Sequence, residues 1–293
     1  MYARGAGEWR RPSLLNMGRL TKAPGPLRMS PQEYDRSSLE GALDYLDQSG
    51  LPDLLWTYFL GNDSVSHAQG PSIQPSYLEN TLDPLIGELR QAVQEHRPKH
   101  SPPPLWVLCS DHGHMLVQAD DHHSIHLGFP FDRELAPLFD SLGLDVLDYP
   151  GEDPHMEAAF SHNGGSGYVY VKGHWCGWTA RAGLEQDVLP VGRAFWQAHQ
   201  SGRLAPDLEG ALSAVLVRDV ELEGWYARYQ ALTPQGERLS LEDWFRRQPP
   251  ADYADPIHRL DNLAGPATGD VLLLSNLPEG FYFGSPSVSL HGG

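Results

Sequence analysis

The stretch that decides the expected fold is Pro104-Leu-Trp-Val-Leu-Cys-Ser-Asp-His-Gly113. Its apolar part, Leu105 to Ser110, predicts a buried strand. The strand would end at Asp111-His112-Gly113, where glycine lets the backbone turn sharply beside two side chains that bind metals well. Because open α/β sheets bind their ligands at the carboxyl ends of parallel strands, this pair predicts a metal site.

A second apolar run, Leu54 to Leu60, is followed by another such pair, Asp63 and His67. These two residues are four apart, so one helical turn would place both on one face. Between the two runs, Ser76-Tyr-Leu-Glu79 matches a capping box and opens a helical pattern that continues to about His96. We therefore expect a βαβ unit with parallel strands, which would place both Asp/His pairs at the same edge of the sheet.

Each pair also has an ordinary structural interpretation. Asp111 can cap a following helix, and Asp63 can be the N-cap of a helix in which His67 is solvated. The histidines at His122, His123 and His126 are interpreted as part of a polar surface loop, because nothing in the sequence defines their geometry. Neither the Asp63/His67 pair nor the Asp111/His112 pair is a specific signal by itself.

Composition and charge limit the classes of function. The chain has 293 residues, 40% of them hydrophobic, which is ordinary for a globular protein. Its formal net charge of −17 opposes binding to nucleic acid polymers and anionic membranes unless a local patch or a metal reverses the field. No apolar run is long enough to span a membrane, and no secretory signal is visible, so the compartment stays open.

Helical and strand patterns alternate along the chain. Residues 1–50 are expected to be largely irregular, although Asp35 to Asp47 can form a short helix with Leu39, Leu43 and Leu46 on one face. Later strands are expected at Gly167–Lys172, Ala214–Arg218 and Asp270–Ser275, and later helices at Arg133–Leu142, Leu184–Gln200 and after Ser240. This alternation predicts an α/β protein.

The motifs taken together resemble a known family. Asp63-Ser-Val-Ser-His67-Ala-Gln-Gly-Pro71, Ser110-Asp-His-Gly113 and Ser289-Leu-His-Gly292 are similar to the type I phosphodiesterase/nucleotide pyrophosphatase-like branch of the alkaline phosphatase superfamily. The resemblance covers about residues 50 to 293. It implies a three-layer alkaline-phosphatase-like sandwich with a mostly parallel central sheet, incomplete at the N-terminus, in which residues 51–293 form a partial metal-binding domain after an irregular segment 1–50.

The resemblance also implies the site and the activity. Two divalent metal ions, expected to be zinc, would share the site, with Asp63, His67 and His291 holding one and Asp111 and His112 helping to hold the other. The implied activity is metal-dependent hydrolysis of phosphate esters, with small phosphodiester or nucleotide-like substrates favoured. No nucleic acid polymer and no membrane span are expected.

One departure from the family pattern affects the expected activity. The family has an early strand that ends in a further metal-binding Asp and is followed by a Thr or Ser nucleophile, and neither is recognisable before Leu54. The chain is therefore interpreted as a fragment or a diverged member, with slow or absent hydrolysis. The alternatives are a non-catalytic protein that keeps the fold and at most one metal, and a phosphomutase or phosphotransferase of the same superfamily.

Overall fold

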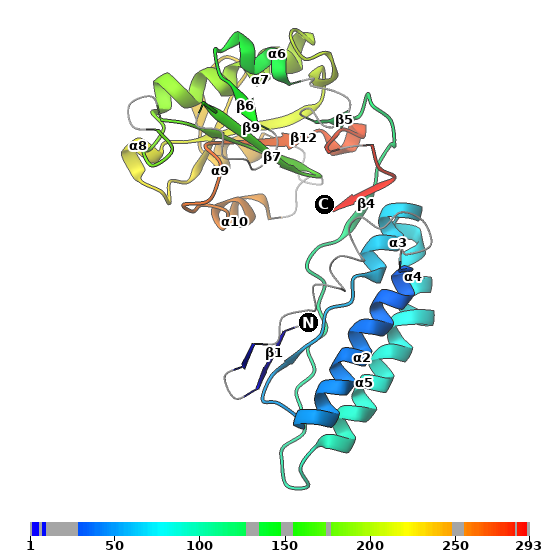
Figure 1. Ribbon diagram of the computed structural model, residues 1–293. Coiled ribbons are helices and arrows are strands. Elements are labelled where there is room, and N and C mark those ends of the chain that lie inside the picture. Colours follow the sequence, from blue (N-terminus) through cyan, green and yellow to red (C-terminus); the bar gives the residue numbers. More distant parts are fainter. Residues whose placement is uncertain are drawn as a thin grey trace. The chain divides into compact units, whose positions relative to one another are not determined.

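The described chain forms two compact units. A computed structural model describes residues 2–5, 8–9, 29–126, 135–147, 155–173, 177–247, 255–284 and 286–291, with the backbone alone described for 2–5, 8–9, 147, 163 and 291. Contacts between residues group the chain into unit 1, Met1–Leu116, and unit 2, Val117–Gly293. Figure 1 shows the helices and strands of both. The domain organisation expected from the sequence, 1–50 and 51–293, stays a prediction.

Unit 1 is mainly helical in its described part. Its helices are α2 (Pro31–Ser49), α3 (Gly61–Gln69), α4 (Gln74–Tyr77) and α5 (Asp83–His96), with the short turns η2 (Pro71–Ile73) and η3 (Leu78–Leu82). Helices α2 and α5 lie side by side (Figure 1), and their apolar faces share one core. Its buried residues are Leu39, Ala42, Leu46, Val65, Tyr77, Leu82, Leu85, Leu89 and Val93.

The helix expected between Asp35 and Asp47 is confirmed and is longer than expected. A capping box at Ser30 starts it, since Oγ of Ser30 accepts from the N–H of Glu33 at 3.2 Å and Oε2 of Glu33 accepts from the N–H of Ser30 at 2.6 Å. Pro31 occupies the first turn, where its missing N–H costs nothing. These residues extend the helix by a full turn toward the N-terminus.

The helix expected from Ser76 is confirmed at its end and wrong at its start. Helical turns run without a break from Gln74 through α4, η3 and α5 to His96. Ser76 lies inside this segment, where its carbonyl and hydroxyl oxygens accept from Nδ2 of Asn80 at 2.8 and 3.2 Å. The helical backbone begins upstream of Ser76, so this serine has no cap to form.

The two predicted parallel strands are wrong in the described chain. The first is reduced to β3 (Leu55–Trp56), which pairs antiparallel with β1 (Tyr2–Gly5), and β1 pairs in turn with β2 (Glu8–Trp9). The second, 105–110, is no strand, and no backbone pairing joins it to any described residue. Its side chains are exposed, 90% at Leu105 and 80% at Leu108. Without a neighbouring strand and a covering layer, an apolar run has nothing to stabilise it as a strand.

Unit 2 is built on a seven-stranded sheet with the order β11-β10-β9-β12-β8-β7-β6. The strands are β6 (Val146–Leu147), β7 (Ala158–Asn163), β8 (Ser166–Val171), β9 (Leu212–Arg218), β10 (Tyr229–Leu232), β11 (Arg238–Leu239) and β12 (Val271–Ser275). Neighbouring strands are antiparallel except for β6 and β7. The three late strands predicted from the sequence are thus confirmed as β8, β9 and β12.

The mixed helix and strand content agrees with the expected fold class, but a mostly parallel central sheet is wrong for the described strands. Hairpins explain the difference, since β7 and β8 are joined through Gly164 and Gly165, and Gly164 adopts φ +59°. Such short connections can join only antiparallel strands. The three-layer sandwich stays a prediction.

Helices cover the sheet of unit 2. They are α6 (Ala136–Ser141), α7 (Leu189–Ser201), α8 (Val220–Glu223), α9 (Leu241–Phe245) and α10 (Pro256–Asp261), with the turns η4 (Leu184–Val188), η5 (Pro206–Leu208) and η6 (Leu277–Glu279). Figure 1 shows α7 on one side of the sheet and α10 on the other. The remaining strands are β5 (Ser124–Ile125), which pairs parallel with β13 (Tyr282–Phe283), and β14 (Ser289–His291); β4 (His114–Leu116) belongs to unit 1.

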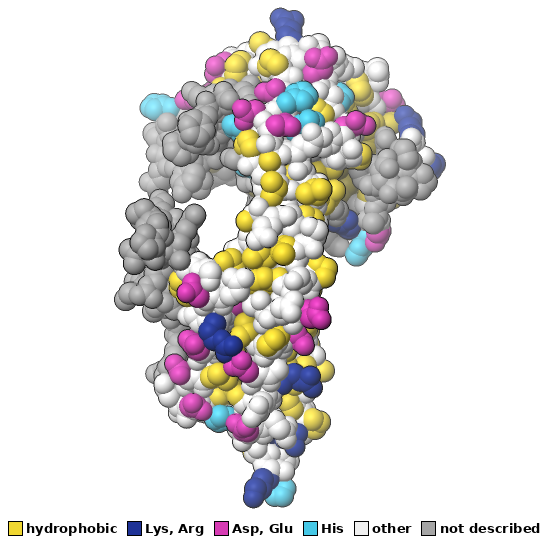
Figure 2. All heavy atoms as spheres, turned by 90° about the vertical axis from the view of Figure 1, so that its right-hand side faces the viewer, with side chains coloured by type: hydrophobic (Ala, Val, Ile, Leu, Met, Phe, Trp, Pro, Cys, Tyr) yellow, Lys and Arg dark blue, Asp and Glu magenta, His cyan; other side chains and the backbone are white. Residues whose placement is uncertain are grey.

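Among the described residues, none of the helices combines the length and the apolar character that crossing a membrane requires. The visible face in Figure 2 mixes hydrophobic side chains with acidic and basic ones.

Candidate functional site

The first candidate pair lies on one face of α3. Asp63 and His67 are one helical turn apart, and Nε2 of His67 lies 3.6 Å from Oδ1 of Asp63. Their expected placement on one helix face is confirmed. The N-cap interpretation of Asp63 is wrong, because α3 begins after Leu60 and no side chain caps it.

The start of α3 is held in place by a buried carboxylate. Oδ1 of Asp35 accepts from the N–H of Gly61 at 2.8 Å, and Oδ2 accepts from the hydroxyl of Tyr77 at 2.8 Å. A Cβ at Gly61 would lie only 1.9 Å from the Tyr77 oxygen and 2.7 Å from the carbonyl oxygen of Pro31, so only glycine fits. Burial raises the pKa of Asp35, although both hydrogen bonds oppose that shift. This contact anchors the helix that carries Asp63 and His67.

The second candidate pair reaches the first through His112. Nε2 of His112 lies 3.9 Å from Oδ1 of Asp63 and 3.7 Å from Oδ2 of Asp111. The Asp111 carboxylate accepts from the N–H of His112 at 3.1 Å and from the hydroxyl of Tyr58 at 3.4 Å. Slight desolvation would raise the pKa of Asp111, but backbone hydrogen bonds from Asp111 and His112 and the neighbouring imidazole lower it overall.

A third histidine, His114, was not predicted from the sequence. Its Nε2 lies 3.0 Å from Oδ1 of Asp63, the shortest of the three imidazole distances to that oxygen. Burial lowers the pKa of His114, while the hydrogen bond with Asp63 works in the opposite direction. A sequence signal existed: alternate residues of an extended chain point to the same face, so His112 and His114 can meet one partner.

We name these side chains together the His/Asp cluster: Asp63, His67, Asp111, His112 and His114. Asp63, His112 and His114 each offer one ligand atom, and the three atoms lie within 4.8 Å of one another. Carboxylate oxygens and imidazole nitrogens are the ligand types that zinc accepts. Asp63, His67 and His112 keep a quarter to a third of their side-chain surface exposed (25%, 34% and 30%), which leaves them reachable by an ion. The donor set therefore fits a divalent metal.

Comparison with known families identifies the class of chemistry expected of the chain. Residues 19–229 match the model of the family described as type I phosphodiesterase / nucleotide pyrophosphatase, which belongs to the alkaline phosphatase superfamily. The chain belongs to this family. The family implies a hydrolase that acts on phosphate esters. Searches of the curated proteins and of the solved structures found no significant match.

The matched region of the phosphodiesterase family contains the whole His/Asp cluster and stops before His291. The backbone of His291 ends strand β14, and its side chain lies outside the described part of the chain. Its convergence with Asp63 and His67 therefore stays a prediction.

A second group of histidines lies in unit 2 and has a structural explanation. Asp120 accepts from the N–H of His123 at 2.9 Å, and Nδ1 of His123 lies 2.8 Å from the same carboxylate. The rings of His122 and His123 both contact Phe281. The surface-loop interpretation is wrong for His126, which is 6% exposed next to the buried strand β5. Nothing in this geometry adds to the family's metal chemistry.

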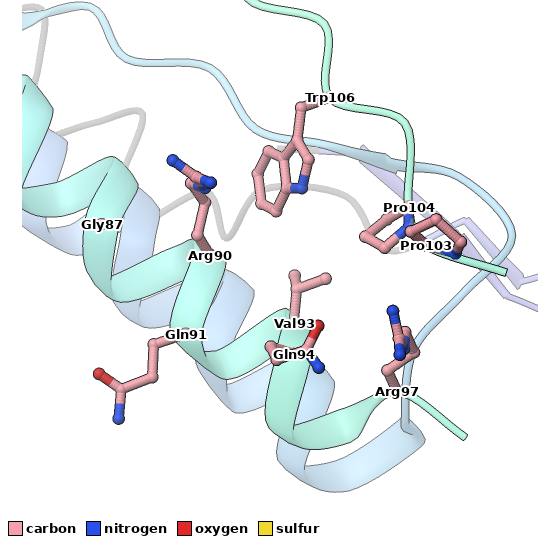
Figure 3. A pocket seen from close by; sticks show the side chains of 9 residues that line it. All are labelled: Gly87, Arg90, Gln91, Val93, Gln94, Arg97, Pro103, Pro104 and Trp106. Carbon is pink, nitrogen blue, oxygen red and sulfur yellow. The ribbon is translucent and has the colours of Figure 1, made fainter. Parts of the chain in front are cut away.

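Unit 1 also has a cavity of about 480 Å³, separate from the His/Asp cluster. Figure 3 shows it between α5 and the chain at Pro103 and Pro104, with Trp106, Arg90 and Arg97 around it. None of the cluster residues lines this cavity. The cavity and the His/Asp cluster are therefore separate places within unit 1.

Proposed function

We propose that the chain hydrolyses small phosphate esters, with phosphodiester or nucleotide-like compounds preferred, at a centre of two divalent ions that we expect to be zinc. In this proposal Asp63, His67 and His291 hold one ion, and Asp111 and His112 help to hold the other. The nucleophile is unassigned. Membership of the family supports the hydrolase class, and the ions and the substrate preference are the proposed part.

The observation that carries the proposal is the meeting of three imidazoles at one carboxylate oxygen. The Nε2 atoms of His114, His67 and His112 lie 3.0, 3.6 and 3.9 Å from Oδ1 of Asp63. One partner comes from the same helix and two come from a segment about 50 residues downstream. Helix α3 and the chain at 111–114 therefore bring two of the proposed ligands, His67 and His112, and the buried His114 to the carboxylate of Asp63.

An anionic substrate would need positive charge at the His/Asp cluster. Bound divalent ions would supply positive charge for phosphoryl oxygens and would lower the pKa of a bound water. The N–H of His112 and the hydroxyl of Tyr58 orient the Asp111 carboxylate before any ligand arrives. Because the chain has a net charge of −17, its general field repels phosphate anions, and a local cationic centre would be needed to admit them.

A non-catalytic member that keeps at most one metal is the second candidate. It is favoured by the single compact three-residue group, Asp63, His112 and His114, found among the described residues. The described Ser30 is engaged in capping α2, whereas Ser13 and Thr21 lie outside the described residues. We therefore expect hydrolysis by this chain to be slow or absent, without a phosphorylated Ser or Thr.

Zinc binding and turnover, measured on the same preparations, test the two candidates. The purified chain, Asp63→Asn and His67→Ala would be titrated with zinc and assayed with a chromogenic phosphodiester and a chromogenic monoester. His100→Ala, which changes an exposed histidine outside the cluster, is the matched control. We expect zinc affinity to fall by more than about tenfold in the two cluster variants and to be unchanged in the control.

The outcomes separate the candidates. Slow diester hydrolysis that needs zinc and disappears in His67→Ala supports the hydrolase. Zinc binding with no turnover in any condition supports the non-catalytic member. A chain that binds no divalent ion, or binds it equally well in Asp63→Asn, contradicts the metal centre altogether.

A further inference from the structure

His114 is more deeply buried than the other members of the His/Asp cluster. Its side chain is 3% exposed, whereas those of Asp63 and His112 are 25% and 30% exposed. His114 therefore contacts the cluster from the protein side.

The distance between the side chains of His114 and Asp63 is that of a hydrogen bond. Nε2 of His114 lies 3.0 Å from Oδ1 of Asp63, inside the usual range for an N–H donor and a carboxylate oxygen. A carboxylate only accepts, so the shared hydrogen belongs to Nε2. While Nε2 donates this hydrogen bond it has no lone pair to offer an ion, and direct coordination, which its distance to the ligand atoms of Asp63 and His112 also permits, is the alternative.

The same ring also touches the two neighbouring imidazoles. Its centroid lies 4.8 Å from that of His67 and 5.5 Å from that of His112, both in edge-on arrangements. His114 thus orients the Asp63 carboxylate through a hydrogen bond. It also restricts the orientation of the two neighbouring imidazole rings by packing against them.

We propose that His114 is a positioning residue, whose Nε2–H holds the Asp63 carboxylate in one orientation and which binds no metal itself. The inference rests on the proposed metal centre and adds a supporting residue that lies outside the predicted ligands. Partners of this kind fix the orientation of metal ligands, and their loss lowers metal affinity by about 10–100-fold.

Two substitutions distinguish positioning from direct coordination. In His114→Gln the amide N–H reaches about as far as Nε2 and can donate to Asp63, whereas His114→Ala removes the donor. We expect zinc affinity, measured by competition with a chromophoric chelator, to fall about 10–100-fold in His114→Ala and to stay within about threefold of wild type in His114→Gln. Equal losses in the two variants would overturn the proposal.

Counting the ligands of bound zinc gives a second readout. X-ray absorption of the zinc-loaded chain should report the same number of imidazole ligands in wild type and in His114→Gln. One imidazole fewer in the variant would make His114 a ligand and refute positioning. This comparison decides the question even if His114→Ala, checked by circular dichroism, fails to fold.

The failure of this inference differs from the failure of the proposed function. If wild type binds no zinc, the proposed function and this inference are both wrong. If wild type binds zinc but His114→Gln loses it as fully as His114→Ala, only the positioning role is wrong.

Discussion

Two apolar runs of similar composition differ in burial and in secondary structure in this molecule. In unit 1, the run from Leu105 to Cys109 is extended and exposed, with Val107 76% and Leu108 80% accessible. In unit 2, the run in β9 is buried, with Leu216 at 0% and Val217 at 1%. Both runs predict a strand from sequence, and only the second forms one.

The difference lies in the neighbours. Strand β9 has β10 on one side and β12 on the other, and Leu216 faces Ala231 and Leu272 across the two ladders. Helix α7 covers the same strand, since a Cβ at Gly192 would touch Val215 and Val217. Among the described residues, 105–109 has no such partner. An apolar run becomes a strand only where its backbone groups are paired and its side chains are covered.

The largest expected effect comes from truncating one leucine in each run. Leu216→Ala should lower the free energy of unfolding by about 2–5 kcal/mol, because it removes buried contacts and leaves a cavity. Leu108→Ala should change it by no more than about 0.5 kcal/mol, because that side chain is largely exposed. Urea unfolding followed by circular dichroism measures both. A large cost at Leu108 would mean that this run is covered in solution.

A smaller effect tests whether the helices of unit 1 are packed as tightly as the sheet of unit 2. Gly61→Ala forces a Cβ against Tyr77 and Pro31 and should destabilise unit 1 by about 1–3 kcal/mol. Gly87→Ala in α5 is the matched control: its Cβ meets nothing within 4 Å, so the substitution should stabilise the helix by about 0.5–1 kcal/mol.

Thermal or urea unfolding of the two glycine variants should therefore show shifts of opposite sign. Gly61→Ala should also weaken zinc binding, since Gly61 begins the helix that carries Asp63. If both alanines have the same effect, the contact between Asp35, Gly61 and Tyr77 does not hold α3.

The smallest effect is the pH dependence that Asp35 adds to unit 1. Its pKa is raised, mainly by burial, above the value of about 3.9 expected in the unfolded chain. Its contribution to stability is therefore complete below that unfolded value and is lost as the pH rises through the higher folded value. Asp35→Asn stays neutral, so its unfolding free energy should fall less than that of wild type across this window.

Urea unfolding at several pH values from about 4 to 6 measures this slope. Asp44→Asn, which changes an exposed aspartate of the same helix, is the matched control. A steeper slope in Asp35→Asn than in wild type would contradict the buried, destabilised carboxylate.

Local signals predicted much of the fold. The strand at 167–172 and the helix after Ser240 were predicted, and Oγ of Ser240 caps that helix, α9, by accepting from the N–H of Asp243 at 3.0 Å. The spacing of Asp63 and His67 predicted their contact on α3. These features depend on residues within a few positions of one another, so the chain near them is sufficient to predict them.

The sequence by itself determined the family and most of the side chains that meet in the cluster, because residue types and short motifs carry that information. Only the tertiary structure decided that 105–110 is no strand, that the sheet of unit 2 is mostly antiparallel, and that His114 contacts Asp63. Pairing and burial join residues far apart in the chain, and their energy depends on which surfaces meet. A local pattern can show that His112 and His114 share a face, but it does not identify the distant residue that they meet.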